Sequence, residues 1–382
     1  MRHKNSVYHG LLQYVPWGAF DELVDEHEGD KGVRRLTSRD HFGSVLYGQL
    51  SGASSLRDIE GALQSHRARL YHVNVKPVKR STLADANASR PAAIFTGLFL
   101  RLMKQTHRGL RRSLEETVYL IDSTSLRLTE LSKDWARFSS GVCGAKAHVI
   151  YDADAGCPVY MAVTAANVND ITTAQAMPIE PGASYVFDLG YYDYNWWAGL
   201  DAAGCRIVTR FKSNTPLRVI EDRPVAKDGA ILSDRVGYLP ARQAKNRKNP
   251  FSDPVREVRV KIETGKILRI LTNDLDASAE EVAALYKHRW EIELFFRWVK
   301  QNLKIKTFLG RSENAIRIQI AIALIAYLLL RLAHAAQKSS LTLLSFTRLV
   351  RANLMHLKRI DRLLGDDIET PQDDRQMAFQ CL

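Results

Sequence analysis

Residues 278–304 read SAEEVAALYKHRWEIELFFRWVKQNLK. Ser278 and, three residues later, Glu281 form the pattern of a capping box, which marks the N-terminus of a helix. Neither Pro nor Gly interrupts the residues that follow. The stretch therefore predicts one long helix from Ser278 to Lys304.

This helix has an apolar face and a polar face, because successive residues turn by about 100°. A single carboxylate on the polar face is consistent with a solvated surface on which Glu293 pairs with Arg297. The neighbouring apolar face is apolar enough to be packed, however, so the polar face is predicted to line a groove. There the acid suits a metal ion and the cations suit phosphates. The apolar face contains Leu285, Ile292, Phe296, Val299 and Leu303, and the polar face contains Tyr286, Arg289, Glu293, Arg297, Lys300 and Lys304.

The whole chain has 382 residues and is 46% hydrophobic, which is enough for sizeable cores and favours two to four structural units. Its 54 Lys and Arg residues minus 42 Asp and Glu residues give a net charge of +12. A protein this basic is expected to bind a polyanion, with nucleic acid favoured over an anionic membrane.

Cysteine usage and hydropathy predict a cytoplasmic protein. The four cysteines show no C-x-x-C spacing, so they are interpreted as reduced thiols, and the N-terminus carries no apolar signal segment. The most apolar run, 318–332, is shorter than the roughly 20 residues of a membrane span and contains Gln319 and Arg331. It is predicted to be a buried helix.

Residues 1–115 are predicted to form a helical, basic N-terminal domain. Between Arg57 and Arg112 there are 12 basic and 3 acidic residues, a net of +9. Short helices with this charge favour a DNA-binding module of the helix-turn-helix kind. A helical dimerisation or packing domain with a basic surface is the alternative.

Strand patterns begin at Thr117 and define the rest of the fold. Strands followed by alternating helices and strands predict a mixed sheet flanked by helices, an α/β fold, in residues 116–212 and 272–335. Between these parts lies a β-rich insertion, 213–271, with a basic loop at 242–248. A basic helix over 342–364 and an acidic tail make up the C-terminal region, 336–382. The predicted core strands are 117–122, 142–151, 159–165, 183–188 and 205–210, with helices at 168–177, 195–202 and 314–335.

Two aspartates are predicted to end buried strands. Asp122 follows Val-Tyr-Leu-Ile, and Asp188 follows Tyr-Val-Phe. A carboxylate in such a place is costly to bury unless it is paired or binds a metal. Together with Glu293 they form three acids from three separate elements, a donor set that suits Mg2+ or Mn2+. Two such ions can activate a hydroxyl and stabilise a leaving oxygen in phosphoryl transfer.

Other polar residues nearby are given simpler interpretations. His148 is interpreted as a satisfied core histidine or a hydrogen-bonding neighbour of the site. Asp152, Asp154 and Asp170 are interpreted as turn and helix-cap acids. Asp193 is an alternative to Asp188 as the second acid, but it does not end a strand. Three tryptophans, Trp196, Trp197 and Trp298, are predicted to pack.

The four residues Tyr286, Arg289, Glu293 and Lys300 match Y-x2-R-x3-E-x6-K without a gap. In this motif the chain resembles the bacterial insertion-sequence transposases known as the IS-four family. Asp122 in Ile-Asp-Ser-Thr is similar to the first acid of that family's DDE triad, and Asp188 in Asp-Leu-Gly-Tyr to the second. The resemblance covers roughly residues 115–335. Leu189 departs from it, because the family often has a small, polar or basic residue there.

The resemblance implies an RNase H-like mixed-sheet core with a mainly β insertion, and a transposase that cleaves element ends and joins 3′ ends to target DNA. It implies that Asp122, Asp188 and Glu293 hold two Mg2+ or Mn2+ ions. Tyr286 and Arg289 would contact phosphates beside the cleaved end, and Lys300 would hold the strand near it. Arg297 and Lys304 are expected to make general phosphate contacts; Arg210 and Lys212 are either further phosphate contacts or an exposed strand end.

The implied partners are double-stranded DNA, as element ends and target, and a second copy of the chain in a paired-end complex. No membrane is implied, and the expected location is the bacterial cytoplasm, associated with the nucleoid. Two alternatives remain open: a metal-dependent nuclease that does not join strands, and a non-catalytic DNA-binding regulator derived from the same core.

Overall fold

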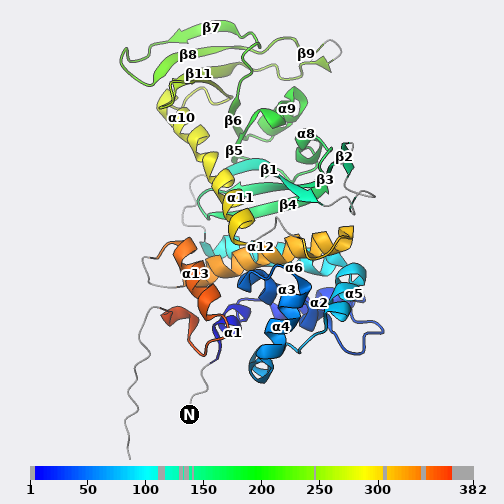
Figure 1. Ribbon diagram of the computed structural model, residues 1–382. Coiled ribbons are helices and arrows are strands. Elements are labelled where there is room, and N and C mark those ends of the chain that lie inside the picture. Colours follow the sequence, from blue (N-terminus) through cyan, green and yellow to red (C-terminus); the bar gives the residue numbers. More distant parts are fainter. Residues whose placement is uncertain are drawn as a thin grey trace, which may run out of the picture.

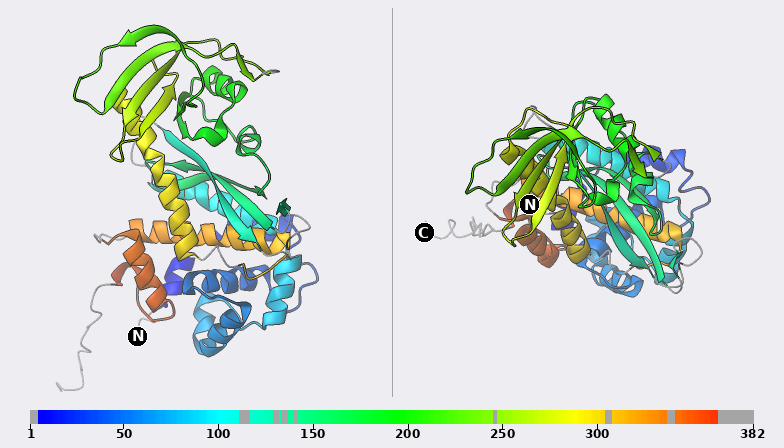
Figure 2. Two further views of the ribbon diagram at one scale, coloured as in Figure 1. Left: turned by 45° about the horizontal axis from the view of Figure 1, so that its top comes forward. Right: turned by 90° about the horizontal axis from the view of Figure 1, so that it is seen from above.

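The computed structural model of the chain describes residues 5–110, 117–128, 132, 137–139, 142–244, 247–303, 308–336 and 341–363. Lys304, Cys381 and the acidic tail after Leu363 lie outside these residues. Figure 1 shows three levels, with a strand-rich lobe above, a central sheet in the middle and a layer of helices below. The left view in Figure 2 keeps the same succession, and the right view looks down on the strand-rich lobe from above.

The central sheet contains five core strands in the spatial order β4-β3-β1-β5-β6. Numbered along the chain, this is the order 3-2-1-4-5. The second core strand, β3, is antiparallel to both neighbours, whereas β5 and β6 are parallel to β1. This is the RNase H-like arrangement. The strands are β1 (Val118–Leu128), β3 (Val142–Asp152), β4 (Cys157–Ala165), β5 (Ser184–Phe187) and β6 (Arg206–Arg210), and β2 (Arg137–Ser139) pairs with the start of β3.

Side chains of the core strands alternate between two separate hydrophobic clusters, as the pleat of a sheet requires. Leu120 and Val149 belong to the cluster on one side, called here the front face. Ile121 and Ile150 belong to the cluster on the other side, the back face. The front cluster includes residues of α6 (Ala92–Leu110), α11 (Trp290–Asn302) and α12 (Glu313–Ala335), and the back cluster includes residues of α8 (Asp170–Ala174), the short η3 (Leu189–Tyr191) and α9 (Tyr194–Ala202).

The strand-rich segment after β6 extends the central sheet. Its last strand, β12, pairs antiparallel with β6, so that one continuous sheet runs from the core into the upper lobe of Figure 1. In this segment Ile231–Tyr238 form one continuous strand, β8. The predicted loop at 242–248 is a short hairpin instead, with residues 245–246 outside the described part. The strands are β7 (Arg218–Arg223), β8 (Ile231–Tyr238), β9 (Arg242–Ala244), β10 (Arg247–Lys248), β11 (Val255–Lys261) and β12 (Ile267–Thr272).

The helical layer is built around α12, which confirms the predicted buried helix. By length and composition α12 could cross a membrane, but 83% of its most apolar stretch is buried inside the protein. It packs against α6, α3 and α5, as Figure 1 shows. The predicted helix over 342–364 is wrong in length, because α13 ends at Asn353. The other helices are α1 (Val7–Leu12), α2 (Trp17–Glu26), α3 (Ser38–Ser51), α4 (Leu56–Ser65), η1 (Arg67–Val73), α5 (Arg80–Ser89), α13 (Leu343–Asn353) and η4 (Ile360–Arg362).

The single long helix predicted over 278–304 is wrong, because it is interrupted at Arg289. Helix α10 covers Ala279–His288 and begins at Ser278, whose side chain accepts a bond from the amide of Glu281 as predicted. The amide of Arg289 bonds to the carbonyl of Tyr286, three residues back, and α11 restarts at Trp290. No Pro or Gly causes this break; it falls at the residue whose side chain reaches the carboxylates described next. The predicted apolar face is buried on both helices.

Candidate active site

Asp122 and Asp188 come together because β1 and β5 are parallel neighbours. Ile121 pairs with Phe187 at the end of their ladder, so the two aspartates follow the last paired residues on adjacent strands. Leu120 and Val186, two positions earlier on each strand, both belong to the front cluster. Side-chain alternation therefore directs both aspartates toward the front face. The prediction that Asp122 ends its strand is wrong, since β1 continues along β3 to Leu128.

Glu293 approaches the front face from α11, which packs on β1. Arg289, one turn earlier, joins the acids. Its Nη2 lies 2.6 Å from a carboxylate oxygen of Glu293, and its Nη1 lies 3.8 Å from Asp122 Oδ2. The side chains of Asp122, Arg289 and Glu293 are 18%, 16% and 30% exposed. One guanidinium is therefore shared by two predicted metal ligands in a partly dehydrated place.

Asp122 is the electrostatically strained member of this group. Burial raises the pKa of its carboxyl from 3.8 to about 7, with Asp188 and Glu293 adding to the rise. The amide of Ser123, 2.7 Å from Asp122 Oδ1, and the guanidinium of Arg289 oppose the rise but do not cancel it. A positive charge brought close to such a carboxyl stabilises its ionised form and lowers its pKa.

A cleft of about 300 Å³ opens beside these acids. Asp122 and Glu293 line it together with two cations of the predicted set, Arg297 and Lys300. Thus α11 supplies an acid and two basic residues to one hollow, as its polar face predicts. Ser123, Thr124, Phe296 and Gln301 complete the lining.

Tyr286 lies at the edge of the group and is 7% exposed. The guanidinium of Arg289 stands 5.7 Å from the centre of its ring. Burial raises the pKa of the phenol, while the nearby Arg289 and Arg210 lower it and Asp188 raises it. Arg210, at the end of β6, is thereby placed in the same neighbourhood as the acids.

The turn after β6 carries Lys212, and sequence inspection missed the residue that holds this turn. Arg269 of β12 donates to the carbonyl oxygens of Lys212, Ser213 and Thr215 at 2.6, 2.9 and 3.1 Å. The exposed ammonium of Lys212 stands 4.2 Å above the ring of Tyr192. The only sequence signal would have been one more arginine in a basic strand, so this clamp was not predictable.

The donor set fits a hard divalent cation, because three carboxylates supply oxygen ligands. Their present partners are different. Asp188 accepts a bond from the amide of Gly190 at 2.7 Å, and Glu293 is paired with Arg289. Within the described ranges no three His, Cys, Asp or Glu side chains are arranged to hold a metal ion. Binding would therefore require Glu293 to exchange its ion pair with Arg289 for the metal.

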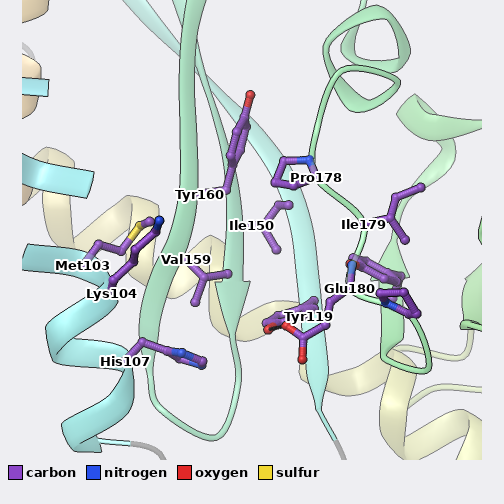
Figure 3. A pocket seen from close by; sticks show the side chains of 12 residues that line it. Met103, Lys104, His107, Tyr119, Ile150, Val159, Tyr160, Pro178, Ile179 and Glu180 are labelled. Atoms are coloured by element: carbon purple, nitrogen blue, oxygen red, sulfur yellow. Dashed lines mark hydrogen bonds between the residues drawn. The ribbon is translucent and has the colours of Figure 1, made fainter. Parts of the chain in front are cut away.

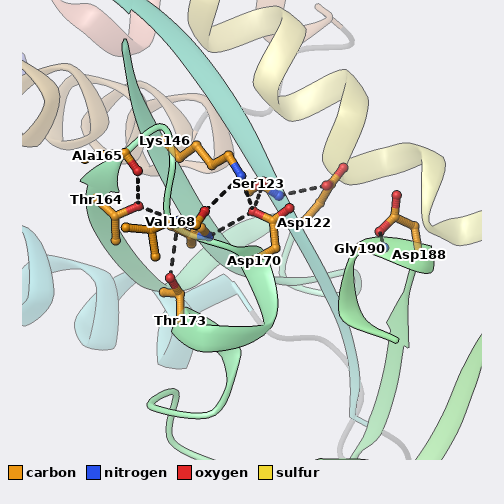
Figure 4. A network of polar contacts seen from close by, with 11 residues as sticks. Asp122, Ser123, Lys146, Thr164, Ala165, Val168, Asp170, Thr173, Asp188 and Gly190 are labelled. Carbon is orange, nitrogen blue, oxygen red and sulfur yellow. Dashed lines mark hydrogen bonds and ion pairs between the residues drawn. The ribbon is translucent and has the colours of Figure 1, made fainter. Parts of the chain in front are cut away.

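Asp170 is not the cap acid that the sequence predicted. Its Oδ1 accepts a bond from Ser123 Oγ at 2.7 Å and lies 3.2 Å from Lys146 Nζ (Figure 4). The N-cap of α8 is Asn169, whose side chain makes no capping bond. Asp170 thus belongs to a polar network directly behind Asp122.

The remaining polar interpretations agree with the structure. His148 is fully buried, bonds through Nε2 to Thr164 Oγ1 at 2.9 Å, and burial lowers its pKa to about 4. Asp152 accepts the amide of Ala155 in a turn, and Asp193 caps α9. Trp196 and Trp197 are buried, and Trp298 packs on Tyr327. The described cysteines Cys143, Cys157 and Cys205 are free thiols.

A larger cavity, of about 410 Å³, lies away from the acids, between α6 and the starts of β1 and β5 (Figure 3). His107, Tyr119 and Glu180 are among its lining residues, and none of the predicted site residues is. Although this cavity is larger, it is therefore separate from the carboxylate cleft.

An RNase H-like sheet with carboxylates beside the carboxyl ends of its parallel strands defines an enzyme of the RNase H-like class. Ligands of open α/β sheets bind at this edge. The family then follows from comparison with known proteins. The model of the transposase DDE domain matches residues 113–329, more than half of the chain. The chain belongs to the DDE transposases, which are metal-dependent enzymes that cut and join DNA.

Individual relatives agree with this assignment. A protein of Sinorhizobium fredii named as a transposase is 42% identical over 271 residues, which cover 70% of this chain and 75% of the relative. A protein of Geobacillus stearothermophilus, named as the transposase of an insertion sequence element, is 29% identical over 282 residues, 70% of this chain and 72% of the relative. A domain of unknown function, DUF4372, matches residues 3–76.

The cryo-EM structure of the piggyBac transposase synaptic complex with hairpin DNA aligns with a TM-score of 0.49 and 11% identity, covering 98% of this chain and 84% of that chain.

Proposed function

We propose that this transposase belongs to the IS-four family with its Y-R-E-K signature, that it cleaves the ends of an insertion sequence, and that it joins the 3′ ends to target DNA. The observation that carries the proposal is the gathering of Asp122, Asp188 and Glu293 at one edge of the sheet. Asp122 and Asp188 follow the last paired residues of parallel strands, and Glu293 lies on the helix packed against β1.

In this proposal the three carboxylates hold two Mg2+ or Mn2+ ions. Bound ions of this kind activate a water or a 3′-hydroxyl and stabilise the leaving oxygen of an in-line displacement. Of the three carboxylates, Asp122 would be stabilised most by a bound cation, because the pKa of its carboxyl is raised to about 7. Arg289 pairs with Glu293 in the protein alone, and its side chain would turn to a DNA phosphate when the acids take up cations.

The DNA strand would run along the polar face of α11. Lys300 and Arg297 line the same cleft as Asp122 and Glu293, which supports their role as phosphate contacts. Tyr286 would contact the phosphate beside the cleaved end together with Arg289. Lys304 is proposed to extend the same row. Arg210 and Lys212 are proposed to hold the strand on the other side, on the turn that Arg269 fixes.

The proposal extends to the whole molecule. The basic helices of the N-terminal domain, residues 1–115, would bind the terminal repeats. Two copies would act together in a paired-end complex on double-stranded DNA, in the bacterial nucleoid. The net charge of +12 supports a polyanionic partner.

The test is an assay of purified protein on DNA that carries the element ends, with Mg2+ or Mn2+. Wild type is compared with Glu293→Gln and with a matched control, Glu291→Gln. Glu291 lies on the same helix, but its carboxylate lies 2.6 Å from His288 Nδ1 and is not part of the acid group. We expect nicking and end joining from wild type and from the control, and neither from Glu293→Gln. Nicking by Glu293→Gln at the wild-type rate would overturn the site assignment.

The same assay decides between a transposase that joins ends and a nuclease. A protein that cleaves in both metals but never yields joined product, with supercoiled target DNA supplied, would favour the nuclease. A protein that binds the ends but cleaves none of them would favour the regulator.

A further inference from the structure

Directly behind the carboxylate cleft, on the back face of the sheet, lies a second acid that the proposed chemistry does not use. Side chains alternate along β1, so Asp122 faces the front and Ser123 faces the back. His148 pairs with Ser123 across the β1–β3 ladder, and Lys146 lies two residues away on the same face. Asp170, the first residue of α8, meets this row from the helix that covers the back face.

Asp170 is tied to β1 and β3 by short polar contacts, drawn in Figure 4. Its Oδ1 accepts a bond from Ser123 Oγ at 2.7 Å, and Lys146 Nζ donates to the same oxygen at 3.2 Å. Lys146 also donates to the carbonyl of Val168 at 3.0 Å, and His148 Nδ1 lies 3.6 Å from Asp170 Oδ1. Because burial lowers the pKa of His148 to about 4, Lys146 is the cation that balances Asp170.

Ser123 connects this network to Asp122. Its hydroxyl binds Asp170, while its amide donates to Asp122 Oδ1 at 2.7 Å. The position of Ser123 therefore affects the orientation of both carboxylates, Asp122 through the amide and Asp170 through the hydroxyl. A change that freed the Ser123 hydroxyl would loosen the peptide whose N–H orients the carboxylate of Asp122.

Asp170 also lies against the turn that carries Asp188. A side-chain carbon added at Gly190 would come within 3.3 Å of Asp170 Oδ2 and 3.0 Å of Asp188 Oδ1. Gly190 supplies the amide that bonds to Asp188, so this close packing leaves the turn little room to shift. The buried phenol of Tyr191 next in the chain neighbours all three aspartates, which together with burial hold its pKa well above the usual value.

We propose that Asp170 is a positioning residue for the catalytic centre: through Ser123 it orients Asp122, and through its packing on Gly190 it holds the turn of Asp188, with Lys146 as its fixed counter-ion. This inference rests on the proposed function, because it presumes that Asp122 and Asp188 are metal ligands. Asp170 itself binds no metal in this scheme. Residues that orient metal ligands change metal affinity by about 10–100-fold when they are removed.

The test measures binding of Mn2+ alone to the purified full-length chain by calorimetry, without DNA. We expect Asp170→Ala to weaken Mn2+ binding about tenfold or more, whereas Asp170→Asn, which keeps an acceptor for Ser123, stays within about threefold of wild type. Ser123→Ala leaves the Asp170–Lys146 pair in place but cuts the connection to β1, so it should weaken binding in the same direction. It also decides the question if Asp170→Ala does not fold.

The matched control is Asp193→Asn, at a buried acid that caps α9, a helix of the back cluster. Asn is an equally good N-cap, so this variant should fold and leave the Mn2+ affinity unchanged. Wild-type affinity in both Asp170→Ala and Ser123→Ala would overturn the positioning role. Complete loss of binding in Asp170→Asn, equal to that of Asp122→Ala, would show a ligand instead and overturn it too. Undiminished binding in Asp122→Ala would instead overturn the metal site of the proposed function.

Discussion

Asp122 and Asp170 stand on opposite faces of the same sheet and are connected through one residue, Ser123, yet their surroundings differ. Asp170 has a lysine and a serine hydroxyl on one oxygen. Asp122 shares a single arginine with Glu293 and sits next to Asp188, and the pKa of its carboxyl is raised to about 7. On the back face Asp170 has a lysine of its own, whereas on the front face Asp122 and Glu293 share one arginine.

This difference separates an acid that holds structure from an acid that is kept ready for a ligand. Groups with perturbed pKa values gather at functional sites, because burial and neighbouring charges are arranged there to suit the chemistry and not the stability of the fold. The satisfied acid behind can then fix the position of the strained acid in front.

The largest effect is expected from Asp122→Asn. Replacing a predicted metal ligand weakens the hold on the ion that would stabilise the negative charge developing in the transition state. Losses of such stabilisation reach on the order of 10³-fold in rate. Nicking of end-containing DNA in Mg2+ should fall at least that far, measured against Asp193→Asn as a structural control. Wild-type rates in Asp122→Asn would remove the front-face acid from the mechanism.

The pH dependence of stability should reveal the same acid without any activity. In the folded, metal-free protein Asp122 keeps its proton up to about pH 7, whereas in the unfolded chain it loses it near 3.8. The folded state therefore binds more protons over this range, and the stability contributed by Asp122 is full below about pH 4 and lost as pH rises through 7. The loss is on the order of 4 kcal/mol, at about 1.4 kcal/mol per pKa unit.

Chemical denaturation of wild type and Asp122→Asn between pH 4 and 8 measures this term. Buried His41 and His148, with pKa values lowered to about 4, act in the opposite direction, so the difference between the two proteins is the readout. We expect wild type to lose stability relative to Asp122→Asn as pH rises, and added Mn2+ to restore it. Parallel curves for the two proteins would contradict the raised pKa.

A smaller effect is expected on the back face from Lys146→Met. The aliphatic stem is kept, but Asp170 loses its cation while only 23% of its side chain is exposed. An acid left without its partner in such a place costs about 1–3 kcal/mol. Unfolding in urea should show this loss. A double variant, Lys146→Met with Asp170→Asn, should recover part of it, because no unpaired charge then remains.

The sequence predicted the front face better than the back. Period-2 and period-3.6 patterns located β1, β5 and α11, and the spacing of Tyr286, Arg289 and Glu293 indicated a polar face on a packed helix. Sequence patterns could not show that β1 continues beyond Asp122, since Ser-Thr-Ser is also a turn signal. They also could not show the break at Arg289, because no Pro or Gly marks it.

The role of Asp170 was missed for a related reason. Asn169-Asp170 at the start of a short helix has the local pattern of a cap, and local patterns carry no information about Ser123 or Lys146 across the sheet. Arg269 was missed in the same way, because its acceptors are carbonyl oxygens of a distant turn. Residues that act through tertiary contacts become visible only once register and topology are fixed.

The smallest effect concerns the cations of the two faces and DNA binding. Arg297 lines the front cleft, whereas Lys146 is bound to Asp170 on the back. Each phosphate contact contributes about one unit to the slope of log affinity against log salt. Arg297→Ala should therefore flatten that slope by about 1 on end-containing DNA and weaken binding several-fold at physiological salt. Lys146→Met should leave the slope unchanged, since its charge is already neutralised inside the protein. Fluorescence anisotropy titrations at several salt concentrations measure both. Equal slopes for wild type and Arg297→Ala would place the DNA away from the cleft. A reduced slope for Lys146→Met would show that Lys146 also contacts DNA, and would contradict a purely supporting role for the back face.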